Sequence, residues 1–179
     1  MKYLFLFFLI SSLNLFDLEN SEKNYIRSIF YYSIELKDSL VIYQKTITKY
    51  SNKFSSDPFL VAYYGAYEVL VAKHSINLYT KYKFIKQGLE KITKSIKIEP
   101  QNLEYRFLRL SILHHLPSIL GYNDLLYEDI NITIQLLQKE DYSILNKKTQ
   151  IGIIEFLLNS NRLTNEQIKT LQELINKIK

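Results

Sequence analysis

The stretch DPFLVAYYGAYEVLVAKHS, residues 57–75, decides how the rest of the chain can fold. Between residues 59 and 72 its only charged side chain is Glu68, so a helix formed here is apolar on every side. Such a helix belongs inside a bundle. Asp57 followed by Pro58 is a typical helix start, because aspartate caps free backbone N–H groups and proline is tolerated at the first helical position. We therefore expect this stretch to be the central helix of an all-α domain.

Amphipathic patterns on both sides of the central stretch predict further helices. The clearest runs over 82–97, where apolar residues recur at alternating spacings of three and four. Only 4 Gly and 3 Pro are present, too few for the many turns of an all-β protein. The sequence therefore predicts an all-α, antiparallel array of about eight helices. Capping residues and apolar stripes place the others over 21–34, 38–50, 103–116, 123–139, 143–158 and 164–178.

Small residues on one side of the central helix predict a close contact with the next helix. Ala62, Gly65 and Ala66 lie on that side, and Gly88 occupies the following predicted helix. Small side chains let paired helices approach each other. We therefore expect the small-residue stripe of the central helix to pack against Gly88.

Length and composition favour one globular domain over 17–179. A chain of 179 residues is long enough for one core, and 47% hydrophobic with 23% charged residues is ordinary for a globular protein. The chain has no cysteine, which excludes disulfides, thiol nucleophiles and thiolate metal ligands. Its net charge of +5 is far from that of a dedicated nucleic-acid binder, which argues against such a partner.

The N-terminal residues 1–16, MKYLFLFFLISSLNLF, have the pattern of a secretory signal peptide. One lysine precedes an apolar run that is shorter than the roughly 20 residues of a membrane-spanning helix. We expect the protein to be exported to the periplasm of a Gram-negative bacterium, with the signal ending between Ser12 and Leu18. The alternative is an uncleaved N-terminus that anchors the protein to the inner membrane.

Two helix pairs within 59–139 resemble the tetratricopeptide repeat. AYYGAYEVL resembles the first helix of such a repeat, and GLEKITKSIKIEPQN resembles the second helix with its boundary proline. Gly65 to Pro100 is roughly ten residues longer than one repeat allows, so we expect the connector 76–81 to bulge. The signal, the AYYGAY helix, NLEYRFLR and PSILGYN together also resemble small exported proteins of uncharacterised function from Bacteroidetes. Both resemblances imply a helical-repeat fold and no particular activity. The residues at the spacings of the second helix are Gly88, Ile92, Ser95 and Pro100.

Glu68, Arg106 and Arg109 are candidates for a buried ion pair. The two arginines stand three residues apart, share a helix face and can clamp one carboxylate. A carboxylate in an apolar helix requires a partner. We therefore expect the arginines to pair with Glu68, or with Asp129 from the next helix. The alternative is that Glu68, Arg106 and Arg109 form a pocket for a small ligand or a reaction.

A candidate partner groove follows from one face of the central helix. Aromatic residues and a histidine recur on that face at spacings of four and seven. If the array curves as helical repeats do, first helices line its concave side, where an extended peptide or a partner helix can bind. The competing interpretation is that these aromatic residues belong to the core. The groove residues are Tyr63, Tyr67, His74, Tyr105 and Arg109.

The remaining chemistry points away from catalysis. The lysines of the predicted helix 82–97 offer an anion or nucleic-acid surface as one alternative and an ordinary solvated face as the other. Nothing in the chain matches a nucleophile elbow or a glycine-rich phosphate loop, and no catalytic residue, cofactor or metal is expected. We expect a noncatalytic, exported protein-binding or scaffolding domain whose partner is a protein or a peptide.

Overall fold

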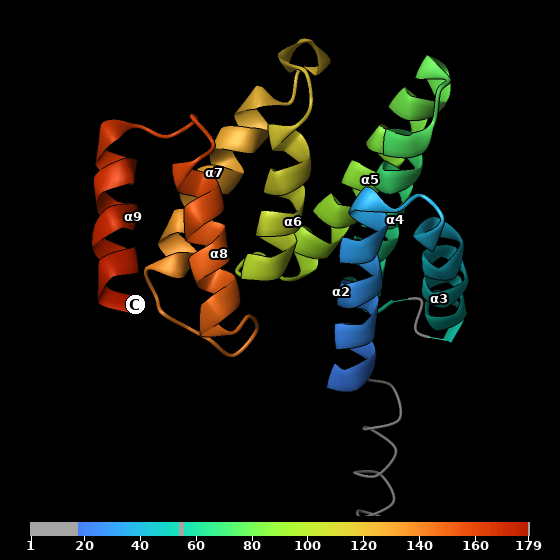
Figure 1. The fold of residues 1–179 in the computed structure, drawn as a ribbon, viewed down its shortest axis with the longest axis horizontal. Coiled ribbons are helices and arrows are strands. Elements are labelled where there is room, and N and C mark those ends of the chain that lie inside the picture. The colour runs from blue at the N-terminus through green and yellow to red at the C-terminus, as the bar shows by residue number, and fades with distance from the viewer. Residues whose placement is uncertain (1–17, 54–55, 179) are drawn as a thin grey trace, which may run out of the picture. The chain divides into compact units, whose positions relative to one another are not determined.

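The computed structural model describes residues 18–178 except 54 and 55, and all regular secondary structure in these residues is helical (Figure 1). The predicted all-α array of about eight helices is thereby confirmed. The predicted signal peptide, 1–16, lies outside the described residues. The elements are α2 (Asn20–Glu35), α3 (Ser39–Lys53), α4 (Pro58–His74), α5 (Leu78–Ile98), α6 (Leu103–His114), the short 3₁₀ helix η1 (Ser118–Leu120), α7 (Asn123–Leu137), α8 (Lys147–Leu158) and α9 (Asn165–Ile178).

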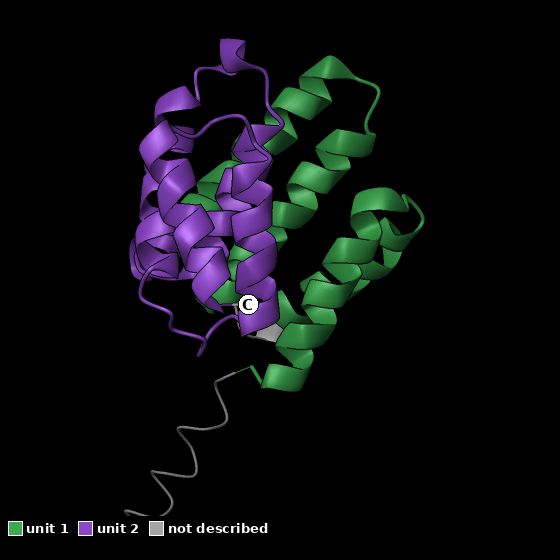
Figure 2. Ribbon diagram, turned by 60° about the vertical axis from the view of Figure 1, so that its left-hand side comes forward, with its two compact units in different colours: residues 1–95 green, residues 96–179 purple. Residues whose placement is uncertain are grey.

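The chain divides into two compact units, residues 1–95 and 96–179 (Figure 2). The boundary falls inside α5, after Ser95. A division into two compact units does not by itself show that each unit is a domain that folds on its own. The single domain that the sequence predicts over 17–179 therefore stays a prediction.

In unit 1, α4 is the central helix, as the sequence predicts. It contacts both α2 and α3, which also contact each other. Its first turn is capped by Asp57, whose Oδ1 accepts a hydrogen bond of 2.8 Å from the backbone N–H of Phe59. A helix that is apolar on all sides buries its side chains only where neighbouring helices cover it on several sides. The buried residues of α4 are Phe59, Leu60, Ala62, Tyr63, Gly65, Ala66, Glu68, Leu70 and Ala72.

Two glycines set how closely α4 and α5 approach. A Cβ atom added at Gly65 would lie 2.5 Å from the backbone oxygen of Gly88, and a Cβ at Gly88 would meet the backbone oxygen of Gly65. Real Cβ contacts are essentially never shorter than 3.0 Å, and backbone cannot swing aside as a side-chain end can. The predicted contact of the small-residue stripe with Gly88 is confirmed.

The predicted connector 76–81 is mostly helix, so the expected bulge is wrong. Helix α5 begins at Leu78, four residues earlier than predicted. Asn77 caps it: the side-chain oxygen accepts from the N–H of Thr80 and the backbone oxygen from the N–H of Lys81, both at 2.9 Å. The extra length between the two repeat-like segments therefore extends a helix. The apolar spacing continues back to Leu78, four residues before Tyr82, so the predicted start was later than the pattern required.

Unit 2 is built from α6 packed on α7 and α8 packed on α9. Phe107 of α6 and Phe156 of α8 meet edge to face, with 5.3 Å between ring centroids. Gly121, after η1, has a φ of 77°, the left-handed conformation that glycine adopts without strain.

The start of α8 differs from the prediction. The helix begins at Lys147, four residues after the predicted 143, and Asn146 caps it through a 2.9 Å hydrogen bond from the N–H of Thr149. The side-chain amide of Gln150 donates to the backbone oxygens of Asp141 and Leu145 at 2.5 and 2.9 Å. These bonds hold the preceding residues as a loop, which no local pattern reveals.

The glycine contact predicts opposite effects at two positions. Gly65→Ala should lower the free energy of unfolding by about 1–3 kcal/mol, the usual cost of overpacking. Gly152→Ala in α8 is the matched control, because a Cβ there meets nothing within 4 Å. It should raise stability by up to about 1 kcal/mol, since alanine is the better helix former. Urea denaturation measures both, and a gain at both positions would contradict the close approach.

Candidate functional site

A buried charged cluster joins α6 to α7 in unit 2. Asp129 is fully buried, and Arg106 and Arg109 are exposed by only 6% and 2%. Arg109 donates from Nε to Oδ2 of Asp129 at 2.6 Å and from Nη2 to Oδ1 at 2.7 Å. Arg106 donates from Nη1 to the same Oδ1 at 2.9 Å. One carboxylate thus holds two guanidinium groups, one of them in the bidentate geometry that makes such pairs strong.

Local structure explains why the two arginines meet one aspartate. Asn102 caps α6 by accepting from the N–H of Glu104 at 3.0 Å, which starts the helix so that positions 106 and 109 share its inner face. The second positive charge is partly balanced by Glu128, which accepts from Arg106 Nη1 at 2.9 Å and has a half-exposed side chain. The cluster therefore ties two helices together.

The arginines bind Asp129, the second of the two partners that the sequence allows. The pairing with Glu68 is wrong, because both carboxylate oxygens of Glu68 accept from Lys91 Nζ at 2.8 Å. Glu68 lies in unit 1 and the arginines in unit 2, and each carboxylate takes a cation from a helix of its own unit. The pocket hypothesis around these three residues loses its basis, because each has a structural partner elsewhere.

Glu68 is a buried carboxylate at the contact of α4 and α5. Burial raises its pKa, and the hydrogen bond and positive charge of Lys91 oppose that rise. Lys91 also lies over the ring of Tyr64, 5.5 Å from its centroid. Because the pKa of Glu68 is raised, the free-energy cost of removing water from the ionised carboxylate exceeds the stabilisation that Lys91 provides.

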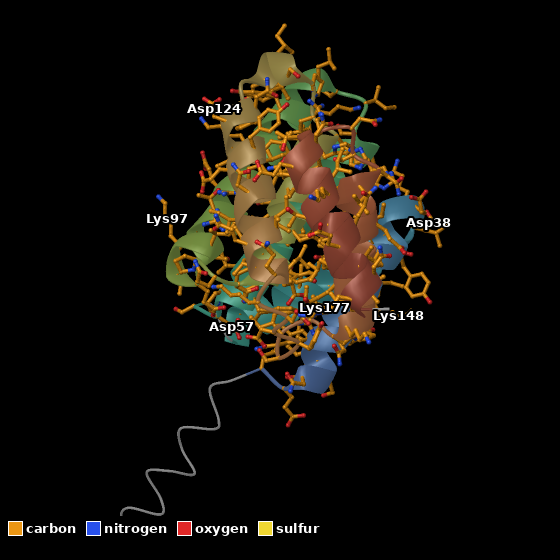
Figure 3. The ribbon with its side chains drawn as sticks, turned by 90° about the vertical axis from the view of Figure 1, so that its left-hand side faces the viewer. Asp38, Asp57, Lys97, Asp124, Lys148 and Lys177 are labelled. Carbon is orange, nitrogen blue, oxygen red and sulfur yellow. The ribbon has the colours of Figure 1, made fainter. Side chains whose placement is uncertain are left out.

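The pairing of Lys91 divides the predicted lysine face of α5. Lys91 turns to Glu68, whereas the other four lysines of this face remain exposed. Figure 3 shows Lys97 pointing away from the ribbon. The exposed members are Lys83, Lys86, Lys94 and Lys97.

The predicted partner groove is wrong, because its residues belong mainly to the core. Tyr63 and Tyr105 are each exposed by only 3%. The backbone oxygen of Tyr63 accepts a 2.6 Å hydrogen bond from the hydroxyl of Tyr43, whose pKa burial raises well above its ordinary value. Tyr67 meets the ring of Tyr43 edge to face at 5.6 Å. The aromatic face of α4 is covered by α2 and α3, so the competing core interpretation applies.

The other two groove residues are also engaged inside the protein. Arg109 belongs to the Asp129 cluster. His74 Nε2 lies 3.3 Å from the backbone oxygen of Ser33, at the end of α2. Of the five residues, only the half-buried Tyr67 and His74 are partly accessible.

The sequence analysis missed the large apolar side chains that face solvent. Fifteen such residues occur in the described chain, and ten of them lie in unit 1. Nine of these ten form two groups, each at a connection between helices. The sequence held no signal of their exposure, since Leu78 and Tyr82 continue the apolar stripe of Ile85 and Leu89. The first group is Tyr31, Tyr32, Leu36, Val41 and Ile42, and the second is Ile76, Leu78, Tyr79 and Tyr82.

The adjacent histidines at the end of α6 pack within unit 2. The ring of His114 lies edge to face against His115 and Phe156, with 5.0 and 5.2 Å between centroids. Burial, helped by the nearby His115 and Arg162, lowers the pKa of His114 and favours the neutral ring. Across the residues that the structure describes, no group of three or more His, Asp or Glu side chains is arranged to hold a metal ion. In the same residues no helix has the length and apolarity needed to cross a bilayer.

Comparison with protein-family models, with curated proteins and with solved structures found no match to this chain. The tetratricopeptide resemblance of 59–139 and the resemblance to exported Bacteroidetes proteins therefore stay predictions.

The buried cluster predicts unequal effects for two neighbouring acids. Asp129→Asn should lower the free energy of unfolding by about 3–5 kcal/mol, because it leaves two buried guanidinium groups without their carboxylate. Glu128→Gln removes the half-exposed acid beside it and should cost less than about 1 kcal/mol. Urea denaturation at neutral pH compares the two variants. Similar losses would show that Asp129 is no more important than a surface acid.

Glu68 predicts a pH dependence with a definite sign. Its folded pKa lies above the ordinary value of 4.5, so the folded state binds the extra proton more readily than the unfolded chain. The stability of the wild type relative to Glu68→Gln should therefore be greatest below about pH 4 and fall as the pH rises to neutral. Chemical denaturation at several pH values measures the difference. A relative stability that rises with pH would mean that the Lys91 pair outweighs burial.

Proposed function

We propose that the protein is a noncatalytic binding or scaffolding protein that holds a protein or peptide partner on the α2–α3 surface. This surface is defined as Tyr31, Tyr32, Leu36, Val41 and Ile42, which come from the last turn of α2, its C-cap and the first turn of α3. Their exposure supports the proposal: each side chain is more than half exposed. Clustered apolar side chains on a protein surface typically mark a binding site.

The composition of the α2–α3 surface favours a protein partner. Tyrosine is enriched at protein interfaces because it combines a large apolar ring with a hydroxyl group that remains hydrated or hydrogen-bonded. The charges at the turn are of both signs, from Glu35, Lys37 and the Asp38 labelled in Figure 3. An apolar patch with a mixed polar rim is the usual composition of such interfaces.

Contacts from α4 support the surface from behind. Lys73 Nζ donates to the backbone oxygen of Ile34 at 2.6 Å, and His74 lies against the backbone oxygen of Ser33. The last carbonyl groups of α2 are thereby held to the central helix. A surface that is ordered before binding loses less entropy when the partner arrives.

Export is part of this proposal. It rests on the apolar N-terminal stretch 1–16, which lies outside the described residues. The expected compartment is the periplasm of a Gram-negative bacterium, and anchoring through an uncleaved N-terminus is the alternative. A tetratricopeptide-like arrangement of the helix pairs is likewise proposed from the sequence alone.

The proposed binding predicts that a partner depends on the α2–α3 surface. The double variant Tyr32→Ser, Ile42→Ser should lose at least about tenfold in affinity for a protein captured from a periplasmic extract and then purified. The matched control, Tyr142→Ser with Ile144→Ser, removes the same residue types from an exposed loop of unit 2 and should bind as the wild type does. Titration of the purified pair gives the dissociation constants. Capture of no partner, or equal binding by both double variants, would contradict the proposal.

A further inference from the structure

The connection between α4 and α5 ends in an exposed apolar tip. Ile76 is exposed by 96%, Leu78 by 80%, Tyr79 by 76% and Tyr82 by 51%. All four lie within seven consecutive residues, where α4 ends and α5 begins (Figure 1). We call residues 73–86 the α4–α5 tip. Large apolar side chains scattered singly are common on surfaces, but four together at one end of a hairpin form a patch.

The folded core cannot cover this patch, because it ends before the tip begins. The last buried residue of α4 is Ala72, and burial on α5 resumes only at Gly88. Between them α5 runs for more than two turns with no fully buried residue, in a helix whose start is capped by Asn77. Leu78, Tyr79 and Tyr82 are thus carried on α5 beyond the buried part of unit 1, and Ile76 lies in the connector before that helix.

The charge of the tip is of a single sign. From Val69 to Leu89 the chain contains four lysines and no aspartate or glutamate. This differs from the α2–α3 surface, where acids and a lysine alternate. A positive surface without acids attracts anionic groups, and the apolar side chains ahead of it require an apolar environment. The lysines are Lys73, Lys81, Lys83 and Lys86.

We propose that the α4–α5 tip docks on an anionic lipid bilayer. The side chains of the tip are of the kinds that such a surface binds. Ile76 and Leu78 are the most exposed and can enter the hydrocarbon boundary, as the apolar side chains of interfacial helices do. Tyr79 and Tyr82 are close by, and tyrosine favours the headgroup level. Lys81 lies between the two tyrosines and Lys83 and Lys86 follow them, with long stems that let the ammonium groups reach lipid phosphates.

The apolar side chains of the tip favour a bilayer over a nucleic acid as the anionic partner. Ile76 and Leu78 offer nothing to a phosphate backbone, so a nucleic acid would leave the most exposed residues uncovered. The proposal uses residues other than the α2–α3 surface. It therefore stands or fails independently of the proposed protein binding.

The absence of tryptophan from the chain permits a site-specific test. Leu78→Trp places a single fluorescent reporter in the tip, and Ile119→Trp places one at an equally open position in η1, where Ile119 is exposed by 92%. Both variants are made in the full chain, so any binding through the N-terminus is common to them. Vesicles of phosphatidylglycerol mixed with phosphatidylcholine are compared with vesicles of phosphatidylcholine alone.

The expected result is a blue shift of the emission for Leu78→Trp with the anionic vesicles, and quenching of that emission by brominated acyl chains. Ile119→Trp should show neither effect. The response of Leu78→Trp should weaken as salt is added, because salt screens the attraction to the headgroups. An unchanged emission at Leu78→Trp, or the same shift in both variants, would overturn the proposal.

Charge variants in the Leu78→Trp background test the role of the lysines. Lys81→Gln with Lys83→Gln should weaken the vesicle partition coefficient roughly 30-fold, given the usual contribution of a lysine near an anionic surface. Lys147→Gln with Lys148→Gln removes the same net charge from exposed positions in unit 2 and should have little effect. Equal losses of vesicle binding in the two double variants would mean that only the net charge of the protein matters, and would overturn docking through the tip. So would single-stranded DNA binding that depends on Lys81 and Lys83 while the vesicles give no response.

Discussion

The close approach of α4 and α5 at Gly65 and Gly88 is the contact on which the rest of unit 1 depends. An apolar helix needs neighbours on several sides, and α2 and α3 cover only part of α4. The remaining side is covered by a helix whose backbone comes within contact distance of its own. This approach brings Lys91 to Glu68, so the one charge of the central helix is neutralised where the two backbones meet. Glycine at both positions is what makes the ion pair reachable.

Most of the charged residues that the sequence offered for binding or catalysis are paired with opposite charges inside the protein. Arg106 and Arg109 hold Asp129 in unit 2, and Glu68 holds Lys91 in unit 1. A buried pair that loses one partner leaves an uncompensated charge, which is why these residues are costly to change. Among the groups left exposed in unit 1 are apolar side chains and lysines near the helix connections.

Two exposed surfaces of unit 1 differ in the charges that accompany them. The α2–α3 surface has acids and a lysine around its tyrosines, whereas the α4–α5 tip has lysines alone. Apolar area supplies a nonspecific attraction in both places, and the surrounding charges decide which partner is compatible. We therefore propose a protein partner for the first surface and an anionic bilayer for the second.

The sequence by itself determined the fold class, the central helix and its partner. Period, caps and small residues are local signals, so the all-apolar stretch 57–75, the Asp57 cap and the contact with Gly88 could be read directly. Helix ends were read less well. The start of α5 was placed at Tyr82 although the apolar spacing continues back to Leu78, and the start of α8 was missed because the side-chain amide of Gln150, inside that helix, holds the loop before it.

Only the tertiary structure decided which residues meet. Spacing shows that Arg106 and Arg109 share a helix face, but it does not show whether Glu68 or Asp129 faces them, because that depends on how helices pack across the chain. Spacing likewise placed Tyr63 and Tyr67 on one face of a helix without showing that α2 and α3 cover it. Exposure is a property of the whole packed unit. For that reason the groove expected on the most apolar helix is core, and the exposed apolar side chains of unit 1 lie mainly at the α2–α3 and α4–α5 connections.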